Sequence, residues 1–244
     1  MKKEEIIKKI KDFSKEQEWN HQFIIDKDIK TRSYDIDSPG YNLNKWPRIK
    51  KIFIEKVFDK SNSFLDVGCS DGYYAIQISK CNKDFNVTGI DIDKLRIERS
   101  NFMKDVYKVS NVNFLEKDLY QLIEDKNSFD VVLGLGLLHR VPDIKKCVED
   151  LCKVSKKFVL FEYKSLRTEE NEILYHDEAT KSNIYNKLYG TPSDKFVSEL
   201  ILNFGFETVL IDKDVKSSLK YPRSIILGEK KWVIQFLKIT KTYT

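Results

Sequence analysis

The sequence predicts an α/β fold built on a doubly wound, seven-stranded, mostly parallel sheet. Two observations carry this prediction. Short apolar runs typical of buried strands recur along the chain, and segments with the spacing of amphipathic helices separate most of them. Strands that alternate with helices form βαβ units, whose strands are parallel and whose crossovers are right-handed. The predicted strands cover residues 63–67, 86–91, 111–116, 129–135, 157–163, 207–212 and 223–229.

The helices are predicted from apolar spacing and from prolines and glycines at their ends. Apolar residues at helical spacing indicate a helix over residues 2–13. Pro47 and Pro192 are each predicted to lie in the first turn of a helix, which tolerates proline because its N–H groups have no acceptor within the helix. Gly205 is placed to end the last helix. Further helices are predicted over residues 72–80, 94–108, 119–124 and 143–153.

Two segments lie outside the alternating pattern. Residues 1–46 combine the first helix with an irregular stretch, so we expect an N-terminal helical extension that covers a main domain of residues 47–244. Residues 165–191 form a polar and aromatic insertion after the fifth strand, and loops of this length are often functional lids or mobile segments. The tail over residues 230–244 is a candidate for a further strand.

Composition and charge exclude several classes of protein. Apolar residues make up 41% of the 244 residues, which is enough for a sizeable core, and the net charge of +5 is a weak bias over this length. No apolar stretch reaches the roughly 18 residues of a membrane span, and the N-terminus lacks the apolar segment of a signal peptide. The four cysteines form no CxxC pair, and no ligand cluster has metal-binding spacing. We therefore expect a cytoplasmic protein without a metal.

The most informative segment is FLDVGCSDGY, residues 64–73, where a buried strand meets a glycine-bearing turn and then a helix. Such a turn lets the backbone approach a ligand closely and offers the N–H groups of a helix start. Dinucleotide folds require G-x-G-x-x-G, but here Ser70 and Tyr73 occupy the second and third glycine positions, which disfavours a nicotinamide cofactor. The spacing acidic-x-G-x-x-x-G is met by Asp66, Gly68 and Gly72.

This spacing resembles motif I of the class I S-adenosylmethionine-dependent methyltransferases, which share a Rossmann-like fold. Further motifs follow in the order of that family over residues 60–230. Residues 87–91 resemble its second strand, and residues 129–132 and 134–139 resemble its fourth strand and following loop. The resemblance implies S-adenosylmethionine as the cofactor, bound by Asp66, Gly68, Ser70, Gly72, Tyr73, Asp91, Ile92, Asp118, Leu119 and Gly134.

The same resemblance implies individual roles. Asp91 would accept hydrogen bonds from both ribose hydroxyls, a task that suits an ionised carboxylate. Ile92 would pack on the adenine face, and Asp118, beside Leu119, would receive the adenine amino group. Tyr73 is a candidate contact of the methionine carboxylate, with packing as the alternative.

A closer similarity links the chain to the tRNA wobble-uridine carboxymethyltransferase group. Trp19-Asn20-His21, GCSDGYYAI, LGLLHRVPD and YGTPSDKFVSELILNFGF carry it. Members of that group hold a carboxylated cofactor with a Lys, a Tyr and an Arg. Residues 18–23 contain no lysine, His139 stands near the tyrosine position, and Arg223 is the arginine candidate. We therefore expect ordinary S-adenosylmethionine.

Three residues are candidates for catalysis. His139 follows the fourth strand at the carboxyl edge, where ligands bind in open α/β sheets, and its ordinary pKa suits a base; the alternative is a packing or capping role. Glu162 ends the fifth strand at the same edge, with a solvated carboxylate as the alternative. His176 lies in the insertion, where it is either a lid residue that touches substrate or a surface histidine.

Three hypotheses of function follow. The first is methyl transfer from S-adenosylmethionine to an O or N atom of a small metabolite or sugar. The second is a tRNA-modifying methyl- or carboxymethyltransferase, and the third is a non-catalytic, cofactor-binding partner subunit. The Lys-rich ends of the chain are interpreted as solvated faces, and the sequence leaves the oligomeric state open.

Overall fold

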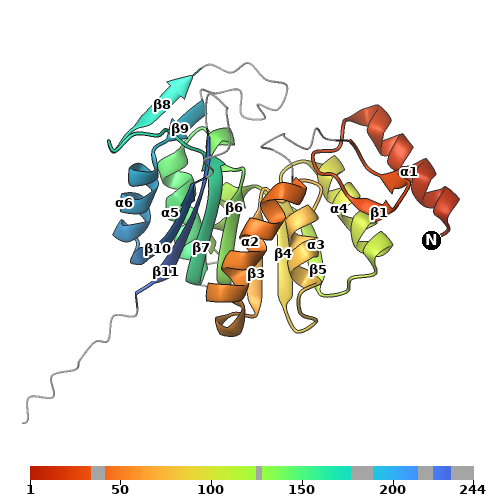
Figure 1. Cartoon of the computed structure of the whole chain (residues 1–244), viewed down its shortest axis with the longest axis horizontal. Helices are drawn as coiled ribbons and strands as arrows, with labels where there is room; N and C mark the ends of the chain where they lie inside the picture. Colours follow the sequence, from red (N-terminus) through yellow and green to blue (C-terminus); the bar gives the residue numbers. More distant parts are fainter. Residues whose placement is uncertain (34–41, 125–127, 177–188, 214–221, 232–244) are drawn as a thin grey trace, which may run out of the picture.

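The computed structural model describes residues 1–33, 42–124, 128–176, 189–213 and 222–231. A seven-stranded sheet lies at its centre in the order β10-β11-β7-β6-β3-β4-β5 (Figure 1). β11 runs antiparallel to both neighbours, and the other pairs are parallel, so the predicted mostly parallel sheet is confirmed. The strands are β3 (Ser63–Val67), β4 (Asn86–Asp91), β5 (Val112–Glu116), β6 (Phe129–Leu135), β7 (Ser155–Lys164), β10 (Phe206–Lys213) and β11 (Arg223–Lys230).

Helices cover both faces of this sheet, and each face has its own apolar core. On one face α1, α2, α3 and α4 contribute to the first core, and on the other α5 and α6 contribute to the second. This arrangement is doubly wound, as the alternation of strands and helices predicted. The helices are α1 (Lys3–Glu16), α2 (Asn42–Lys56), α3 (Tyr73–Ser79), α4 (Lys94–Tyr107), α5 (Ile144–Val154) and α6 (Asp194–Asn203), with short 3-10 helices η1 (Phe58–Lys60), η2 (Leu119–Glu124) and η3 (Leu138–Arg140).

Helix α2 begins earlier than its sequence predicted. It starts at Asn42, so Pro47 lies inside the helix and not in its first turn. Asn42 is fully buried and exchanges two hydrogen bonds with the backbone of Gln22, which fixes the start of the helix by a contact 20 residues away. Residues 119–124, predicted as a helix, form the 3-10 helix η2.

The irregular stretch predicted after the first helix contains a small hairpin. β1 (Ile24–Asp26) pairs antiparallel with β2 (Ile29–Lys30). Trp19 and Phe23 lie just before this hairpin and are fully buried in the core that they share with α1. Their rings pack edge to face. The N-terminal segment is therefore packed on the same face as α4, as Figure 1 shows.

The insertion after β7 is partly described. β8 (Ile173–His176) pairs antiparallel with β9 (Tyr189–Pro192), and residues 177–188 between them lie outside the described part. Pro192 ends β9 and does not open a helix; Ser193 caps α6 by accepting a hydrogen bond from the Phe196 N–H. Gly205 follows the end of α6 with a φ of +82°, as predicted for a helix stop. The further strand proposed for the tail falls almost wholly on residues 232–244, outside the described ranges.

The strand order places a crevice at one edge of the sheet. β4 and β5 lie on one side of β3, whereas β6 and β7 lie on the other. The connections after β3 and β6 therefore turn away from each other, and ligands in open α/β sheets bind at this switch point. In the described part of the chain, no helix combines the length and apolar character that a membrane crossing needs.

Candidate functional site

The turn between β3 and α3 is held open by its backbone conformation. Gly68, Ser70 and Gly72 all have positive φ, at 69°, 53° and 78°. A side chain on Gly72 would place its Cβ only 2.7 Å from Phe114 and 2.8 Å from Ser100, so glycine is required there by both conformation and space. The turn directs the Ser70 N–H to the Asp91 Oδ2, at 2.9 Å.

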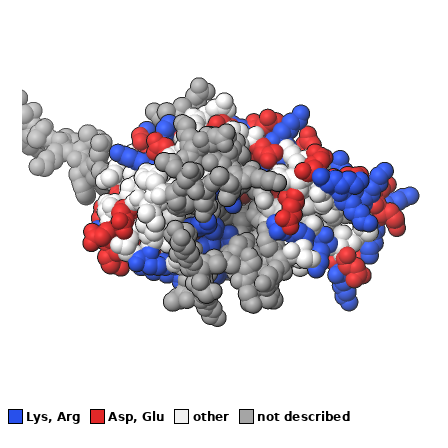
Figure 2. Space-filling model, turned by 90° about the horizontal axis from the view of Figure 1, so that it is seen from above, with Lys and Arg blue, Asp and Glu red and all other residues white. Residues whose placement is uncertain are grey.

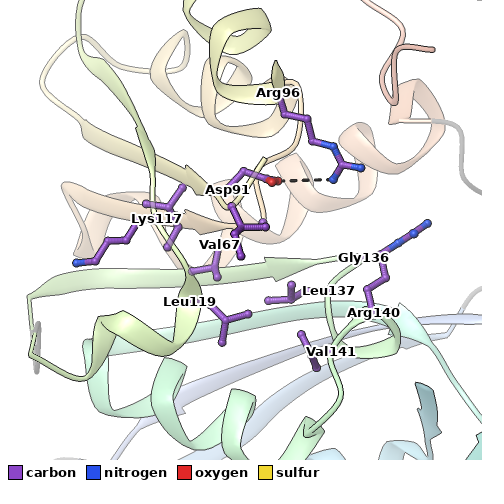
Figure 3. Close-up of a pocket in the computed structure, with 12 residues that line it drawn as sticks. Val67, Asp91, Arg96, Lys117, Leu119, Gly136, Leu137, Arg140 and Val141 are labelled. Atoms are coloured by element: carbon purple, nitrogen blue, oxygen red, sulfur yellow. Dashed lines mark ion pairs between the residues drawn. The ribbon is translucent and has the colours of Figure 1, made fainter. Parts of the chain in front are cut away.

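Asp91 ends β4 and lies against this turn. Its Oδ1 accepts the Asp93 N–H at 3.0 Å, and its Oδ2 lies 3.8 Å from the Arg96 guanidinium (Figure 3). Burial raises the pKa of Asp91 above its usual value, although Arg96 opposes this shift. Each carboxylate oxygen retains a second lone pair that can accept another hydrogen bond.

A mostly apolar pocket of about 590 Å³, open to solvent, lies beside Asp91. Figure 3 shows Asp91 and Arg96 on one side of this pocket, with Leu119, Leu137 and Val141 on the other. Apolar side chains on one wall and a carboxylate on the other suit a ligand in which a flat ring is joined to a polar sugar. Ile92 and Lys117 complete the wall next to Asp91. We refer to this space as the first pocket.

A larger cavity of about 1270 Å³ continues from the first pocket. Gly68, Arg96, Gly136 and Arg140 line both spaces, so the two are joined at the turn after β3. We call the larger space the second cavity. Its described lining residues are Gln17, Asn20, His21, Lys45, Asp66, Gly68, Cys69, Ser70, Tyr74, Arg96, Leu135, Gly136, His139, Arg140, Lys164 and Arg223.

A buried carboxylate supports two of the cations in the second cavity. Glu162 accepts hydrogen bonds from the Arg223 guanidinium, whose Nη2 lies 3.1 Å from Oε2, and from the Lys45 ammonium at 3.3 Å. Burial opposes ionisation of Glu162, but Arg223 and Lys45 outweigh it and lower its pKa to about 2. Burial lowers the pKa of Lys45 to about 8, with Glu162 opposing. Glu162 is therefore a fixed, buried anion, so the alternative of a solvated carboxylate is wrong, and its catalytic role stays a prediction.

Asp66 stands apart from this ion cluster. It is buried at the end of β3, lines the second cavity, and its Oδ2 has no hydrogen-bond partner in the described part of the chain. Burial raises its pKa to about 7, with the Ala75 N–H opposing and the charge of Asp91 adding to the shift. A carboxylate in this state is stabilised by any cationic group that enters the cavity.

His139 lies in η3 and lines the same cavity. It is buried, and its Nδ1 has no hydrogen-bond partner in the ranges that the structure describes. Burial lowers its pKa well below the ordinary value, and Arg223 and Arg140 add to the shift. The imidazole is therefore neutral near pH 7 and has a lone pair available to accept a proton.

The structure brings together seven of the residues predicted from the sequence. These residues line the first pocket, the second cavity or both: Asp66, Gly68, Ser70, Asp91, Ile92, Leu119 and His139. They come from the ends of β3, β4, β5 and β6, as the switch-point argument requires.

Other predicted site residues have different surroundings. Tyr73 packs between His21 and Phe23, and the next residue, Tyr74, lines the cavity in its place. Gly134 lies within β6, where its Cα faces Phe161 and Leu151. Gly136, two residues later, lines both spaces instead.

Three further predicted residues do not line either space among the described contacts. The Asp118 carboxylate accepts the Tyr120 N–H at 3.0 Å in a local turn that starts η2. Gly72 lies on the side of the turn after β3 that packs against Phe114 and Ser100. His176 ends β8, opposite Tyr189, and its side chain lies outside the described part.

Sequence reasoning missed most of the basic residues of the cavity. Arg140 directly follows His139 and Lys164 lies two residues after Glu162, and this proximity was the available signal. Lys45 lies in the segment that the sequence assigned to the cover, where no local pattern marks it. It takes part in the site through Glu162, a contact across 117 residues.

The N-terminal segment is fastened to the turn after β3. Asp71, fully buried in this turn, accepts the N–H groups of Asn20 at 2.5 Å and His21 at 3.1 Å. Arg99 of α4 lies 3.6 Å from the Asp71 carboxylate and donates to the carbonyls of Phe13 and Gln17. The predicted cover thus contributes Gln17, Asn20 and His21 to the wall of the second cavity.

Structures of similar shape support the fold. The N-terminal domain of EvdMO1, solved with S-adenosylhomocysteine and D-fucose, matches with a TM-score of 0.73 and 17% identity over 95% of this chain and 98% of that domain. The magnesium protoporphyrin IX methyltransferase ChlM of Synechocystis PCC 6803, solved with S-adenosylmethionine, matches with a TM-score of 0.61 and 15% identity over 82% of this chain and 87% of ChlM.

Curated relatives match over shorter segments. The 27-O-demethylrifamycin SV methyltransferase of Amycolatopsis mediterranei is 40% identical over 82 residues, which are 32% of this chain and 29% of that enzyme. The ubiquinone biosynthesis O-methyltransferase of Pelagibacter ubique is 30% identical over 104 residues, 40% of this chain and 39% of that enzyme. The matched segment thus spans under two fifths of the length of each relative.

The closer resemblance to the carboxymethyltransferase group stays a prediction. The broader assignment has direct support, because the model of a family described as "Methyltransferase domain" matches residues 58–221, about two thirds of the chain. This match contains the turn after β3, Asp91, His139 and Glu162. The chain therefore belongs to the methyltransferase domain family, whose cofactor is S-adenosylmethionine.

Proposed function

We propose that this protein transfers the methyl group of S-adenosylmethionine to an oxygen or nitrogen atom of a small metabolite or sugar. The observation that carries the proposal is the junction of two spaces at one turn. The first pocket has apolar walls suited to an adenine ring and the Asp91 carboxylate suited to a ribose, and the second cavity extends past Gly68 and Gly136 toward polar side chains. A sulfonium at the junction would face the second cavity.

The residues present fit the cofactor. Asp91 is placed to accept from ribose hydroxyls, and Ile92 and Leu119 offer apolar contacts for the adenine ring. Asp66 supplies a buried carboxylate oxygen without a described partner, which suits the ammonium of the methionine moiety. The cofactor, when bound, supplies an already activated methyl group for in-line displacement.

The protein's part in the reaction is positioning and proton transfer. Holding two reactants in a near-attack geometry can lower the barrier by roughly 7–11 kcal/mol. His139, neutral and on the wall of the second cavity, would accept the proton of an acceptor hydroxyl or ammonium. Burial and the nearby cations make it a weak base, and an anionic group bound beside those cations would raise its pKa toward the range in which a general base is effective. Glu162 would hold Lys45 and Arg223 in place, because both cations contact its carboxylate.

The names of two of the curated relatives favour oxygen as the acceptor atom, whereas a third is a release factor glutamine methyltransferase of Fusobacterium nucleatum. Both the rifamycin and the ubiquinone enzymes are described as acting in O-methylation. The proposal for this chain follows that class of reaction without naming the acceptor.

Calorimetry and a transfer assay test the proposal. Titration with S-adenosylhomocysteine should show saturable binding, and incubation with methyl-labelled S-adenosylmethionine and a whole-cell extract should label a product in the low-mass fraction. Absence of binding would overturn the cofactor site. Binding without any labelled product would favour the non-catalytic alternative, and label found only in RNA, with steep salt dependence, would favour the tRNA alternative.

A further inference from the structure

We infer that the acceptor of this methyltransferase carries an oxyanion, a carboxylate or a phosphate, that binds among the basic side chains of the second cavity. The inference rests on the proposed function and specifies its substrate class. It starts from the charge of the cavity wall. Among the described lining residues one is acidic, Asp66, and five are basic: Lys45, Arg96, Arg140, Lys164 and Arg223.

Described acids lie next to three of the basic residues of this wall. Glu162 lies behind the wall and is shared by Lys45 and Arg223, so one negative charge faces two positive ones. Asp91 and Asp93 both lie close to Arg96, at 3.8 and 3.2 Å. Arg140 of η3, Lys164 of β7 and Arg223 of β11 come from separate elements and converge on this wall. Figure 2 shows Lys and Arg atoms in the hollow at the centre of this face.

The cofactor adds positive charge next to these basic side chains. S-adenosylmethionine carries a carboxylate, an ammonium and a sulfonium, so its net charge near pH 7 is +1. Loading the site therefore adds a positive charge to a cavity that is already basic. A cationic acceptor would add to the repulsion between like charges in this partly desolvated space, and a neutral acceptor would leave that repulsion unchanged. An anionic acceptor reduces the repulsion between the positive charges of the cofactor and of the wall, and the same charges attract it into the cavity from solution.

The pKa of His139 also indicates that its surroundings are positively charged. Besides burial, the groups that lower the pKa of His139 are Arg223, Arg140, Lys164 and Lys45, all of them cations. The positive field therefore reaches the residue proposed to accept the proton. Guanidinium groups bind carboxylates and phosphates through paired N–H donors, so Arg140 and Arg223 suit either oxyanion.

The first test is direct binding to the full chain. Pyrophosphate and malonate are titrated into the protein with and without saturating S-adenosylhomocysteine, and malonamide serves as the neutral analogue of malonate. We expect both anions to bind the loaded protein and malonamide not to bind, with affinity that falls as salt is added. The tighter of the two anions indicates whether phosphate or carboxylate is preferred.

Variants tie the binding to the cavity. Lys164→Gln should weaken the preferred anion about tenfold, and Lys164→Arg should retain most of the affinity because it keeps the charge. Lys195→Gln, a change on the exposed surface of α6, removes the same charge and should leave anion binding unchanged. Thermal unfolding of each variant establishes first that it is folded.

The second test follows the transferred methyl group. An extract is separated by anion exchange before the labelled transfer assay, and we expect label in products of the retained, anionic fraction. Label confined to the neutral or cationic fraction would overturn the inference while the proposed function stands. Anion binding that S-adenosylhomocysteine abolishes would also overturn it, because the cations would then serve the carboxylate of the cofactor. Failure of S-adenosylhomocysteine to bind at all would count against the proposed function itself.

Discussion

Two buried acids beside the same turn differ in their surroundings. Asp91 receives N–H groups from Ser70 and Asp93 and lies near Arg96, so its ionised form is supported although burial raises its pKa. Asp66, one strand away, has an oxygen without a described partner and a pKa of about 7, which burial causes. Asp91 is thus prepared to accept hydrogen bonds, whereas Asp66 is prepared to respond to a cation.

Replacing Asp91 tests the ribose site. Asp91→Ala should weaken S-adenosylhomocysteine binding by about 1.5–3 kcal/mol, the usual contribution of hydrogen bonds to a charged group. Isothermal titration calorimetry measures the change, and Asp84→Ala, at an exposed acid in the loop before β4, is the matched control. An affinity equal to that of the unmodified protein would show that the ribose binds elsewhere.

The raised pKa of Asp66 predicts that cofactor affinity depends on pH. Below its pKa of about 7 the carboxyl is protonated and must lose its proton before it can pair with the ammonium of the cofactor. Binding is therefore weaker at low pH, and affinity for S-adenosylhomocysteine should rise roughly tenfold between pH 5.5 and pH 7. Asp66→Asn should flatten this dependence. Parallel pH profiles for the two proteins would contradict the assignment.

At the scale of elements, the turn after β3 and the end of α6 use glycine for different reasons. Both Gly72 and Gly205 have a φ near +80°. A Cβ on Gly72 would meet Phe114 and Ser100 below 3 Å, whereas nothing lies within 4 Å of a Cβ on Gly205. The two sites therefore separate the effect of backbone conformation from the effect of crowding.

Alanine substitutions at these glycines should differ in cost. Gly205→Ala carries only the left-handed conformation, about 1–2 kcal/mol, as measured by urea unfolding. Gly72→Ala adds steric overlap, and its cost should exceed that of Gly205→Ala by at least about 1 kcal/mol. Gly72→Ala should also weaken S-adenosylhomocysteine binding, because the turn carries the Ser70 N–H. Equal unfolding free energies for the two variants would contradict the packing argument.

At the scale of the whole molecule, Arg99 joins the N-terminal segment to the methyltransferase core. Its guanidinium is almost fully buried and contacts Asp71 and the carbonyls near the end of α1. Arg99→Met should lower the free energy of unfolding by about 3–5 kcal/mol, because Asp71 is left as a buried charge without its cation. Arg48→Met is the control; it removes a half-exposed pair with Asp212 and should cost under about 1 kcal/mol. Similar losses in both variants would contradict this role.

The sequence was informative where burial imposes a local pattern. Strands such as residues 63–67 and 129–135 are apolar because both faces of the sheet are covered, so the sheet could be predicted in full. Asp66, Gly68 and Asp91 were identified because the turn requires fixed spacing. Lys45 and Arg223 reach Glu162 across 117 and 61 residues, and no local pattern encodes such contacts. The end of β6 was predicted correctly, but the family spacing pointed to Gly134 inside the strand, whereas Gly136, directly after it, lines both spaces.

The position of β11 has a consequence for the growing chain. This strand lies between β10 and β7, both synthesised before it, and its first residue, Arg223, completes the ion cluster with Glu162 and Lys45. A nascent polypeptide cannot complete the ion cluster, or join β10 to the sheet, until β11 has left the ribosome and inserted between β7 and β10. Both apolar cores also stay incomplete until then, because Ile225, Ile226 and Leu227 of β11 belong to them.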